Sequence, residues 1–115
     1  IKFLRHIERT SVILFLLDIS QEPYEDAEKT YKMLLDELSQ HSSELSLKPR
    51  VVALNKIDIP AVRSRVSHWR RIFEKSHIKL LPISAITGEG LEDLLDEVAY
   101  LIRRIKGINS DAQKA

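Results

Sequence analysis

The sequence has no cysteine and almost no net charge. Without cysteine it can form neither a disulfide framework nor a thiol nucleophile. Its four histidines lack the mutual spacing of metal ligands, so no metal site is expected. Lysine and arginine total 18 residues against 17 aspartate and glutamate residues, so no overall electrostatic field draws the chain to DNA or to a membrane.

Long hydrophobic runs are also missing. The longest one, residues 12–17, is far too short to span a bilayer, and no secretory signal pattern opens the chain. We therefore expect a cytoplasmic protein without a membrane partner. Apolar residues make up 43% of the 115 positions, which is enough for the core of one small domain.

The start of the chain indicates a segment of a longer protein. It begins at Ile1 without a methionine, and residues 1–10 carry apolar side chains at helical spacing, as if the chain were entered inside a helix. We expect a domain over residues 1–107 and a tail or linker over residues 108–115, because the end of the chain has little apolar surface to bury.

Strand patterns and helix patterns alternate along the rest of the chain. Continuous apolar runs predict strands over residues 11–17 and 51–54 and a third strand before Ser84. The first of these is expected to be buried on both faces, as is typical of a parallel sheet.

Apolar residues three and four positions apart predict the helices between and after these strands, over about 24–40, 61–76 and 91–106. Trp69 falls in the apolar stripe of the second helix and is expected in the core. A serine-rich loop is predicted over residues 41–48. The order of elements indicates an α/β fold of three parallel strands with flanking helices, which is half of a doubly wound sheet.

Three polar side chains follow the second predicted strand. Asn55, Lys56 and Asp58 stand there, and Pro60 then forces a new element to begin. A carboxylate can accept from the N1–H and the exocyclic amine of guanine, an amide can donate to N7, and a lysine stem can lie along the ring. Adenine has no proton at N1. In the alternative interpretation, Asp58 caps the helix that follows Pro60.

Small residues follow the third predicted strand. Ser84 and Ala85 precede a turn that contains Gly88 and Gly90, and small side chains let a backbone N–H approach a ligand closely. The Ala85 N–H would suit the O6 acceptor of guanine. Because both loops leave the carboxyl ends of parallel strands, we expect them to converge on one base site.

The two motifs together resemble those of a known class of proteins. Residues 55–58 (Asn-Lys-Ile-Asp) and 84–87 (Ser-Ala-Ile-Thr) look like the fourth and fifth sequence motifs of the Ras-like GTPases of the translation-factor class. Residues 3–10, the strand that ends at Leu17, and residues 83–91 resemble one branch closely, the bacterial Obg (CgtA) ribosome-associated GTPases. The resemblance implies the C-terminal half of a P-loop GTPase G domain.

The resemblance also implies a role for each residue of the first motif. Asp58 would accept from the guanine N1–H and amine, and Asn55 would donate to N7 and brace the neighbouring loop. Lys56 would stack over the base.

The second motif would complete the base site. By resemblance, the Ala85 backbone N–H would donate to O6, and Ser84 would hold Asp58 in place. Ile86 and Thr87 would close the pocket wall.

For the intact parent protein, the resemblance implies a magnesium-dependent GTPase that binds GTP and GDP and associates with the large ribosomal subunit during its assembly. The 115 residues contain neither a G-x-x-x-x-G-K motif for the phosphates nor an Asp-x-x-Gly sequence for the magnesium side. We therefore expect this chain to contain no catalytic residue and no magnesium ligand, to recognise the base, and not to hydrolyse GTP by itself.

Two other classes of protein stay open. In a phosphoacceptor receiver domain, Asp18 would be phosphorylated and Ser84 would be a switch hydroxyl, although no second acidic pair is there to bind magnesium. In a non-catalytic RNA- or ribosome-binding module, the nucleotide motifs would be vestigial and the helix with Arg70 and Arg71 would contact RNA. We favour a solvated face for that helix, because its basic residues spread around an exposed arc.

Overall fold

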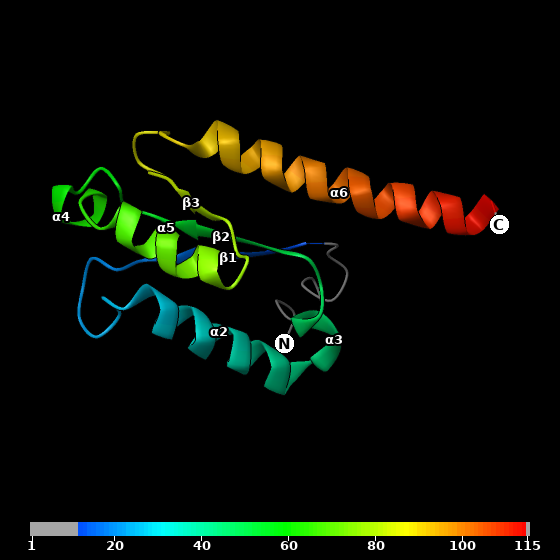
Figure 1. The fold of residues 1–115 in the computed structure, drawn as a ribbon, viewed down its shortest axis with the longest axis horizontal. Coiled ribbons are helices and arrows are strands. Elements are labelled where there is room, and N and C mark those ends of the chain that lie inside the picture. The colour runs from blue at the N-terminus through cyan, green and yellow to red at the C-terminus, as the bar shows by residue number, and fades with distance from the viewer. Residues whose placement is uncertain (1–11, 115) are drawn as a thin grey trace.

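The computed structural model describes the backbone of residues 12–114 and the side chains of residues 12–107 (Figure 1). Three parallel strands form one sheet in the order β1 (Ile13–Leu17), β2 (Arg50–Leu54) and β3 (Leu80–Pro82). Helices α2 (Ala27–His41) and α5 (Val66–Lys75) cover one face, α6 (Leu91–Lys114) covers the other, and α3 (Ser43–Ser46) and α4 (Pro60–Arg63) are short connections. The predicted α/β fold with three parallel strands and flanking helices is confirmed.

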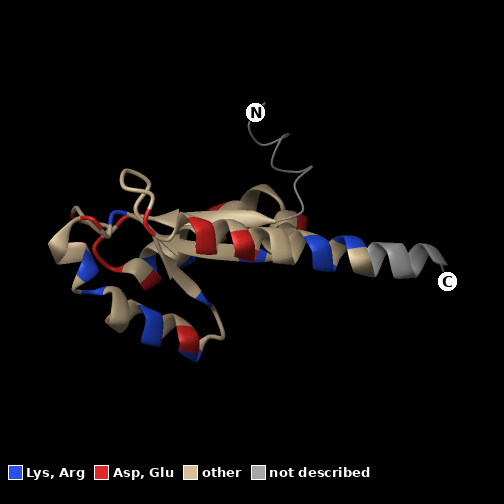
Figure 2. Ribbon diagram, turned by 90° about the horizontal axis from the view of Figure 1, so that it is seen from above, with Lys and Arg blue, Asp and Glu red and all other residues tan. Residues whose placement is uncertain are grey.

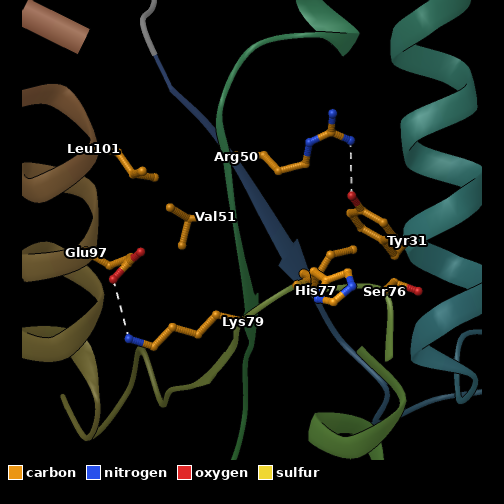
Figure 3. A pocket seen from close by; sticks show the side chains of 9 residues that line it. Tyr31, Arg50, Val51, Ser76, His77, Lys79, Glu97 and Leu101 are labelled. Atoms are coloured by element: carbon orange, nitrogen blue, oxygen red, sulfur yellow. Dashed lines mark hydrogen bonds and ion pairs between the residues drawn. The ribbon is translucent and has the colours of Figure 1, made fainter. Parts of the chain in front are cut away.

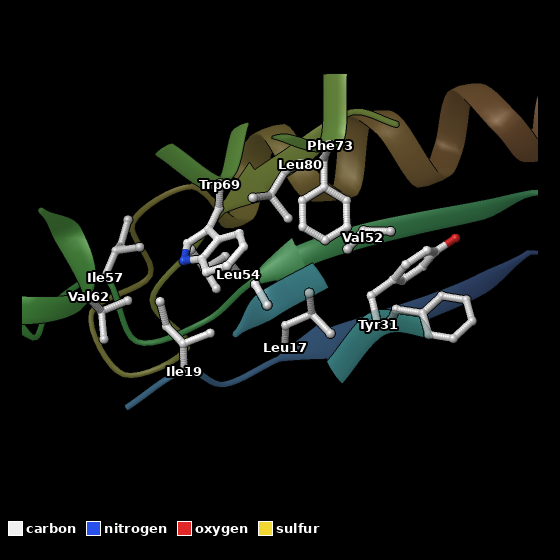
Figure 4. Packing of buried hydrophobic residues seen from close by; sticks show 12 residues of the cluster. Leu17, Ile19, Tyr31, Val52, Leu54, Ile57, Val62, Trp69, Phe73 and Leu80 are labelled. Carbon is white, nitrogen blue, oxygen red and sulfur yellow. The ribbon is translucent and has the colours of Figure 1, made fainter. Parts of the chain in front are cut away.

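The central strand β2 is buried on both faces and divides the core in two. Val52 and Leu54 point into the larger cluster, beneath α2 and α5 (Figure 4), while Val51 and Ala53 point into the smaller cluster beneath α6. Successive side chains of a strand point to opposite faces, so an unbroken apolar run is what a strand between two helical layers requires.

Aromatic side chains fill the larger cluster. The ring of Tyr31 meets those of Phe15 and Phe73 edge to face, with centroids 5.2 and 5.5 Å apart. Trp69 packs in the same cluster, as its place in the apolar stripe predicts. Its buried indole Nε1–H has no acceptor among the described residues.

Two connections differ from the prediction because of helix caps. α2 begins at Ala27, since the Asp26 carboxylate accepts a hydrogen bond of 3.0 Å from the Lys29 N–H, and this cap sets the first turn. The predicted loop over 41–48 contains α3, which the Ser42 hydroxyl caps by accepting from the Leu45 N–H at 3.2 Å. Leu45 is buried, and this short helix packs against α2.

The helix predicted over residues 61–76 is split in two. Pro60 stands in the first turn of α4, where its missing N–H costs no hydrogen bond. The Arg65 N–H then donates to the Val62 carbonyl at 3.0 Å, and this three-residue bond tightens the backbone before α5 begins at Val66.

Helix α6 is longer than predicted and continues to Lys114. No proline interrupts its last turns, and the single Gly107 weakens a helix without ending it. Acidic residues lie in its first turn, where they complement the helix dipole, and basic residues follow near 103–106 (Figure 2). The division into a domain and a tail at residue 107 stays a prediction. Within the described range, no helix combines the length and apolar character needed to cross a membrane.

Strand β1 is buried on one face only, so the prediction of burial on both faces was wrong. Phe15 and Leu17 pack beneath α2 and α5, whereas Leu14 and Leu16 on the opposite face are 46% and 50% exposed. The reason is that α6 packs over β2 rather than β1. The helix pattern noted over residues 1–10 lies outside the described residues.

The central strand provides a direct test of this core. We expect Leu54→Ala to lower the free energy of unfolding by about 2–5 kcal/mol, because Leu54 is fully buried and truncation leaves a cavity. Leu47→Ala is the matched control: that side chain is 83% exposed, so its truncation changes stability by less than about 0.5 kcal/mol. Urea unfolding followed by Trp69 fluorescence measures both. Equal losses for the two variants would contradict the assigned core.

Candidate functional site

The loops that follow β2 and β3 lie side by side because backbone pairing continues beyond the strands. The Asn55 N–H donates to the Leu17 carbonyl at 2.8 Å, and the Ile83 N–H donates to the Leu54 carbonyl at 2.8 Å. The Ile57 N–H then reaches the Ile83 carbonyl at 3.2 Å. Both polar motifs are therefore brought to the same carboxyl edge of the sheet, where open α/β sheets bind ligands.

Asn55 links the two loops. Its side-chain oxygen Oδ1 accepts from the N–H of the next residue, Lys56, at 2.8 Å. It also accepts from the Ala85 N–H at 3.1 Å, and this second bond joins residues 30 positions apart in the sequence. The amide of Asn55 thus braces the neighbouring loop. The Ala85 N–H already donates to Asn55 Oδ1. It can therefore donate to a base oxygen only if it leaves Asn55 or divides its hydrogen bond between the two acceptors.

Ser84 and Asp58 form the second link. The Ser84 hydroxyl donates to Asp58 Oδ1 at 2.9 Å, and its oxygen accepts from the Thr87 N–H at 3.1 Å. Ser84 is fully buried, whereas Asp58 is exposed. Among the described residues, no donor contacts the second oxygen of Asp58, Oδ2. A fixed carboxylate with one free oxygen can therefore accept from an external N–H group.

The alternative interpretation of Asp58 as a helix cap was wrong. The cap position of α4 is held by Ile59, and no side chain makes a capping hydrogen bond there. Asp58 precedes this position and turns its side chain to Ser84 instead. The Asn-x-x-Asp spacing is therefore not explained by the start of the helix.

Lys56 is held in an unusual conformation and is paired across the sheet edge. Its φ is +71°, in the left-handed region, and its Nζ lies 2.6 Å from Asp18 Oδ2. The Ser20 N–H and hydroxyl both donate to Asp18 Oδ1, at 2.8 and 2.6 Å. Burial opposes ionisation of Asp18, but the hydrogen bonds from Lys56 and Ser20 outweigh it and lower the pKa of its carboxyl.

Arg63 joins the same two loops, a contact that no sequence pattern predicted. Its Nε donates to the Ile57 carbonyl at 3.0 Å, and its Nη2 lies 2.6 Å from Glu89 Oε1. The hydrogen bond between Arg63 and Glu89 raises the pKa of the guanidinium and lowers the pKa of the carboxyl. Arg63 falls in the helix predicted over residues 61–76, whose basic residues are expected on a solvated face, because no local pattern reports a contact across 26 residues.

The remaining predicted residues lie at the rim of this edge. Ile86 is 83% exposed, and Thr87 is also exposed. Their place beside Ser84 and Ala85 agrees with a wall residue, but their contact with a base stays a prediction. Within the described residues, no group of three or more histidine, aspartate or glutamate side chains is arranged to hold a metal ion.

The Asp18 pair gives a pH-dependent expectation. Because its folded pKa is below the unfolded value, ionised Asp18 favours the folded state at neutral pH, and this contribution disappears as the pH falls through the folded pKa. The pair is half exposed, so Asp18→Asn should lower the unfolding free energy by less than about 1 kcal/mol at pH 7.

Urea unfolding from pH 7 down to about pH 3 follows this difference through the range in which a carboxyl titrates. Glu37→Gln is the control, because it removes the same charge from an exposed position on α2. A difference between Asp18→Asn and the unmodified chain that stayed constant down to the lowest pH would contradict the pairing.

Comparison with known proteins finds relatives that share one name, GTPase Obg. The chain is 41% identical over 106 residues to GTPase Obg of Syntrophus aciditrophicus. This alignment covers 92% of this chain and 31% of that protein. It is 41% identical over 115 residues to GTPase Obg of Syntrophotalea carbinolica, covering 99% and 32%. GTPase Obg of Moorella thermoacetica is 45% identical over 102 residues, covering 89% and 24%. No protein-family model matches the chain.

A solved structure supports the same relationship. The crystal structure of Era in complex with MgGDPNP and nucleotides 1506–1542 of 16S ribosomal RNA aligns with a TM-score of 0.55 at 26% identity. The alignment covers 82% of this chain and 30% of the Era chain.

The fold and these relatives define the class as the G domain of the P-loop GTPases. The sequence is more specific within that class. It is similar to GTPases of the Obg type, which supports a C-terminal segment of such a G domain, and it spans a quarter to a third of the length of these curated relatives.

Proposed function

We propose that this chain is the guanine-base recognition half of a GTP-binding protein. The observation that carries the proposal is the pair of side-chain hydrogen bonds that join the two motif loops, from Ala85 to Asn55 and from Ser84 to Asp58. They hold an amide and a carboxylate at the edge of the sheet with base-recognising groups still available. The free oxygen of Asp58 and the Asn55 amide nitrogen match the N1–H and N7 sides of guanine.

The other motif residues act around these two. In the proposal, Asp58 accepts from both the N1–H and the amine of guanine, which adenine does not offer in the same pattern. The Ala85 N–H exchanges its Asn55 acceptor for O6. The stem of Lys56 covers one face of the ring while its ammonium stays on Asp18, and Ile86 packs at the pocket wall.

The activity proposed for the whole protein follows from its relatives. Because the Obg relatives are named GTPases and the Era structure contains MgGDPNP, we infer a magnesium-dependent GTPase for the whole protein. The expected cytoplasmic location and the expected partner, the large ribosomal subunit, follow from the resemblance to the Obg branch and not from Era, whose RNA is 16S ribosomal RNA. The phosphate and magnesium motifs are missing from these 115 residues. This chain therefore binds GDP and GTP through the base and releases no phosphate by itself.

Competition binding tests the proposal. The chain is titrated into fluorescently labelled GDP, and unlabelled GDP, GTP and ADP are then added separately. We expect stronger displacement by GDP and GTP than by ADP, and no phosphate release from GTP. Equal displacement by ADP, or no binding of labelled GDP, would favour instead an RNA-binding module with vestigial nucleotide motifs.

A further inference from the structure

The amino edge of the sheet, opposite the motif loops, contains a hollow of about 460 Å³. It arises from the register of the strands: Leu80, the first residue of β3, pairs with Val52, so Arg50 and Val51 extend β2 beyond β3. The loop from α5 to β3 borders the open space, with α2 on one side and α6 on the other (Figure 3). A volume of this size is in the range of small-molecule sites.

Arginine, histidine and lysine side chains from separate elements line this hollow. Arg50 comes from β2, and His77 and Lys79 come from the loop that leads into β3. Figure 3 shows Arg50 beside Tyr31 on the α2 side, and Lys79 reaching toward Glu97 on α6. Glu97 is the one acidic residue of the lining, and its carboxylate lies 3.4 Å from the Lys79 ammonium.

The charge of Arg50 is not neutralised by a carboxylate within the described part of the chain. Its Nη1 donates to the Tyr31 hydroxyl at 3.1 Å and its Nη2 to the Ser46 carbonyl at 2.6 Å, and both acceptors are neutral. A guanidinium has five N–H donors, so these bonds fix its orientation and leave other donors for a ligand. A fixed, partly buried cation of this kind favours an anion.

His77 adds a second, independent feature. Its φ is +59°, at the position after a helix where glycine is usual, and the Ile78 N–H closes the end of α5 by donating to the Phe73 carbonyl at 3.0 Å. His77 therefore has a backbone conformation that is strained for most residues other than glycine, and its side chain lines the hollow.

We propose that this hollow binds a phosphate group carried on a larger organic molecule. The flat guanidinium fork of Arg50 matches two phosphate oxygens. The Lys79 ammonium on the opposite wall is paired with Glu97, but it keeps further N–H donors for the ligand. Val51 and Leu101 give the hollow apolar walls, and its volume exceeds what inorganic phosphate needs, so the organic part of a phosphate ester has room. This site is separate from the proposed base site at the other edge of the sheet.

An NMR titration with three probes tests the proposal and identifies the source of the phosphate. Inorganic phosphate, AMP and a short oligouridine RNA are added separately, because none of them contains guanine. We expect saturable shifts of the Arg50, His77 and Lys79 amides with AMP. Tighter binding of the RNA at the same amides would assign the site to an RNA backbone, and shifts with AMP alone would assign it to a free ester.

Matched charge variants complete the experiment. Arg50→Gln should weaken AMP binding by about tenfold or more, because a charged hydrogen bond is lost. Arg65→Gln removes the same charge at the other end of α5 and should leave the affinity unchanged. Lys79→Gln should weaken binding by about fivefold. The Lys79 side chain is 68% exposed, so its substitution should not disturb the fold. Lys79→Gln therefore tests the site even if Arg50→Gln does not fold. No saturable shift with any probe, or equal weakening by Arg65→Gln, would overturn the proposal.

Discussion

Asp58→Asn is expected to change the preference of this chain from guanine to xanthine nucleotides. The asparagine oxygen still accepts from N1–H, but its NH₂ group donates where the carboxylate accepted from the guanine amine. Xanthine has a carbonyl at that position and becomes the better partner. We expect GDP affinity to fall by roughly tenfold to a hundredfold, because a hydrogen bond to a charged group is replaced by a donor clash.

Affinities of the unmodified chain and the variant for GDP and xanthosine diphosphate, measured side by side, test this expectation. Asp36→Asn is the matched control, since it removes the same charge from an exposed position on α2. Thermal unfolding of each variant shows that the fold is kept. An unchanged preference for GDP in Asp58→Asn would remove Asp58 from the base site.

Gly90→Ala should be the most damaging single substitution in the loop after β3. Gly90 has a φ of +77°, and a Cβ there would lie 2.2 Å from the Pro82 carbonyl oxygen and 3.3 Å from the Ile83 Cα. Both neighbours are backbone, so the loop or β3 must move. We expect a loss of about 3 kcal/mol or more in the free energy of unfolding, from backbone strain and overpacking together.

Gly88 provides a matched control for that substitution. Its φ is +87°, but no atom lies within 4 Å of an added Cβ. Gly88→Ala therefore carries the backbone strain alone and should cost about 1–2 kcal/mol. Urea unfolding compares the two variants. Equal losses would mean that the close packing of Gly90 on β3 does not exist in solution.

The parts of the fold that sequence patterns could predict are those set by neighbouring residues. The buried run of β2 and the polar residues where it ends are both local, so the strand and the position of Asn55 and Asp58 followed from them. The start of α2 was misplaced because the Asp26 cap competes with the apolar pattern. The exposed face of β1 could not be predicted, because exposure depends on where α6 packs.

The candidate site shows the same limit. Its motif residues could be found in the sequence, and the Ser84 hydroxyl lies on Asp58 as the resemblance implied. The bridge from Arg63 to Glu89, the pair of Lys56 with Asp18 and the engagement of the Ala85 N–H join residues far apart in the chain. Contacts of this kind depend on how the loops approach in space, which spacing along the sequence does not encode.

An NMR titration of this chain with GDP and, separately, with ADP shows whether the two motif loops recognise guanine. The backbone amides of Asn55, Asp58 and Ala85 are followed, since they report on the two motif loops. We expect shifts that cluster at these residues with GDP and are missing with ADP. The Ala85 amide should shift strongly, because its acceptor changes from Asn55 to the base. Equal shifts with both nucleotides, or none with either, would contradict a guanine-recognition site in this chain.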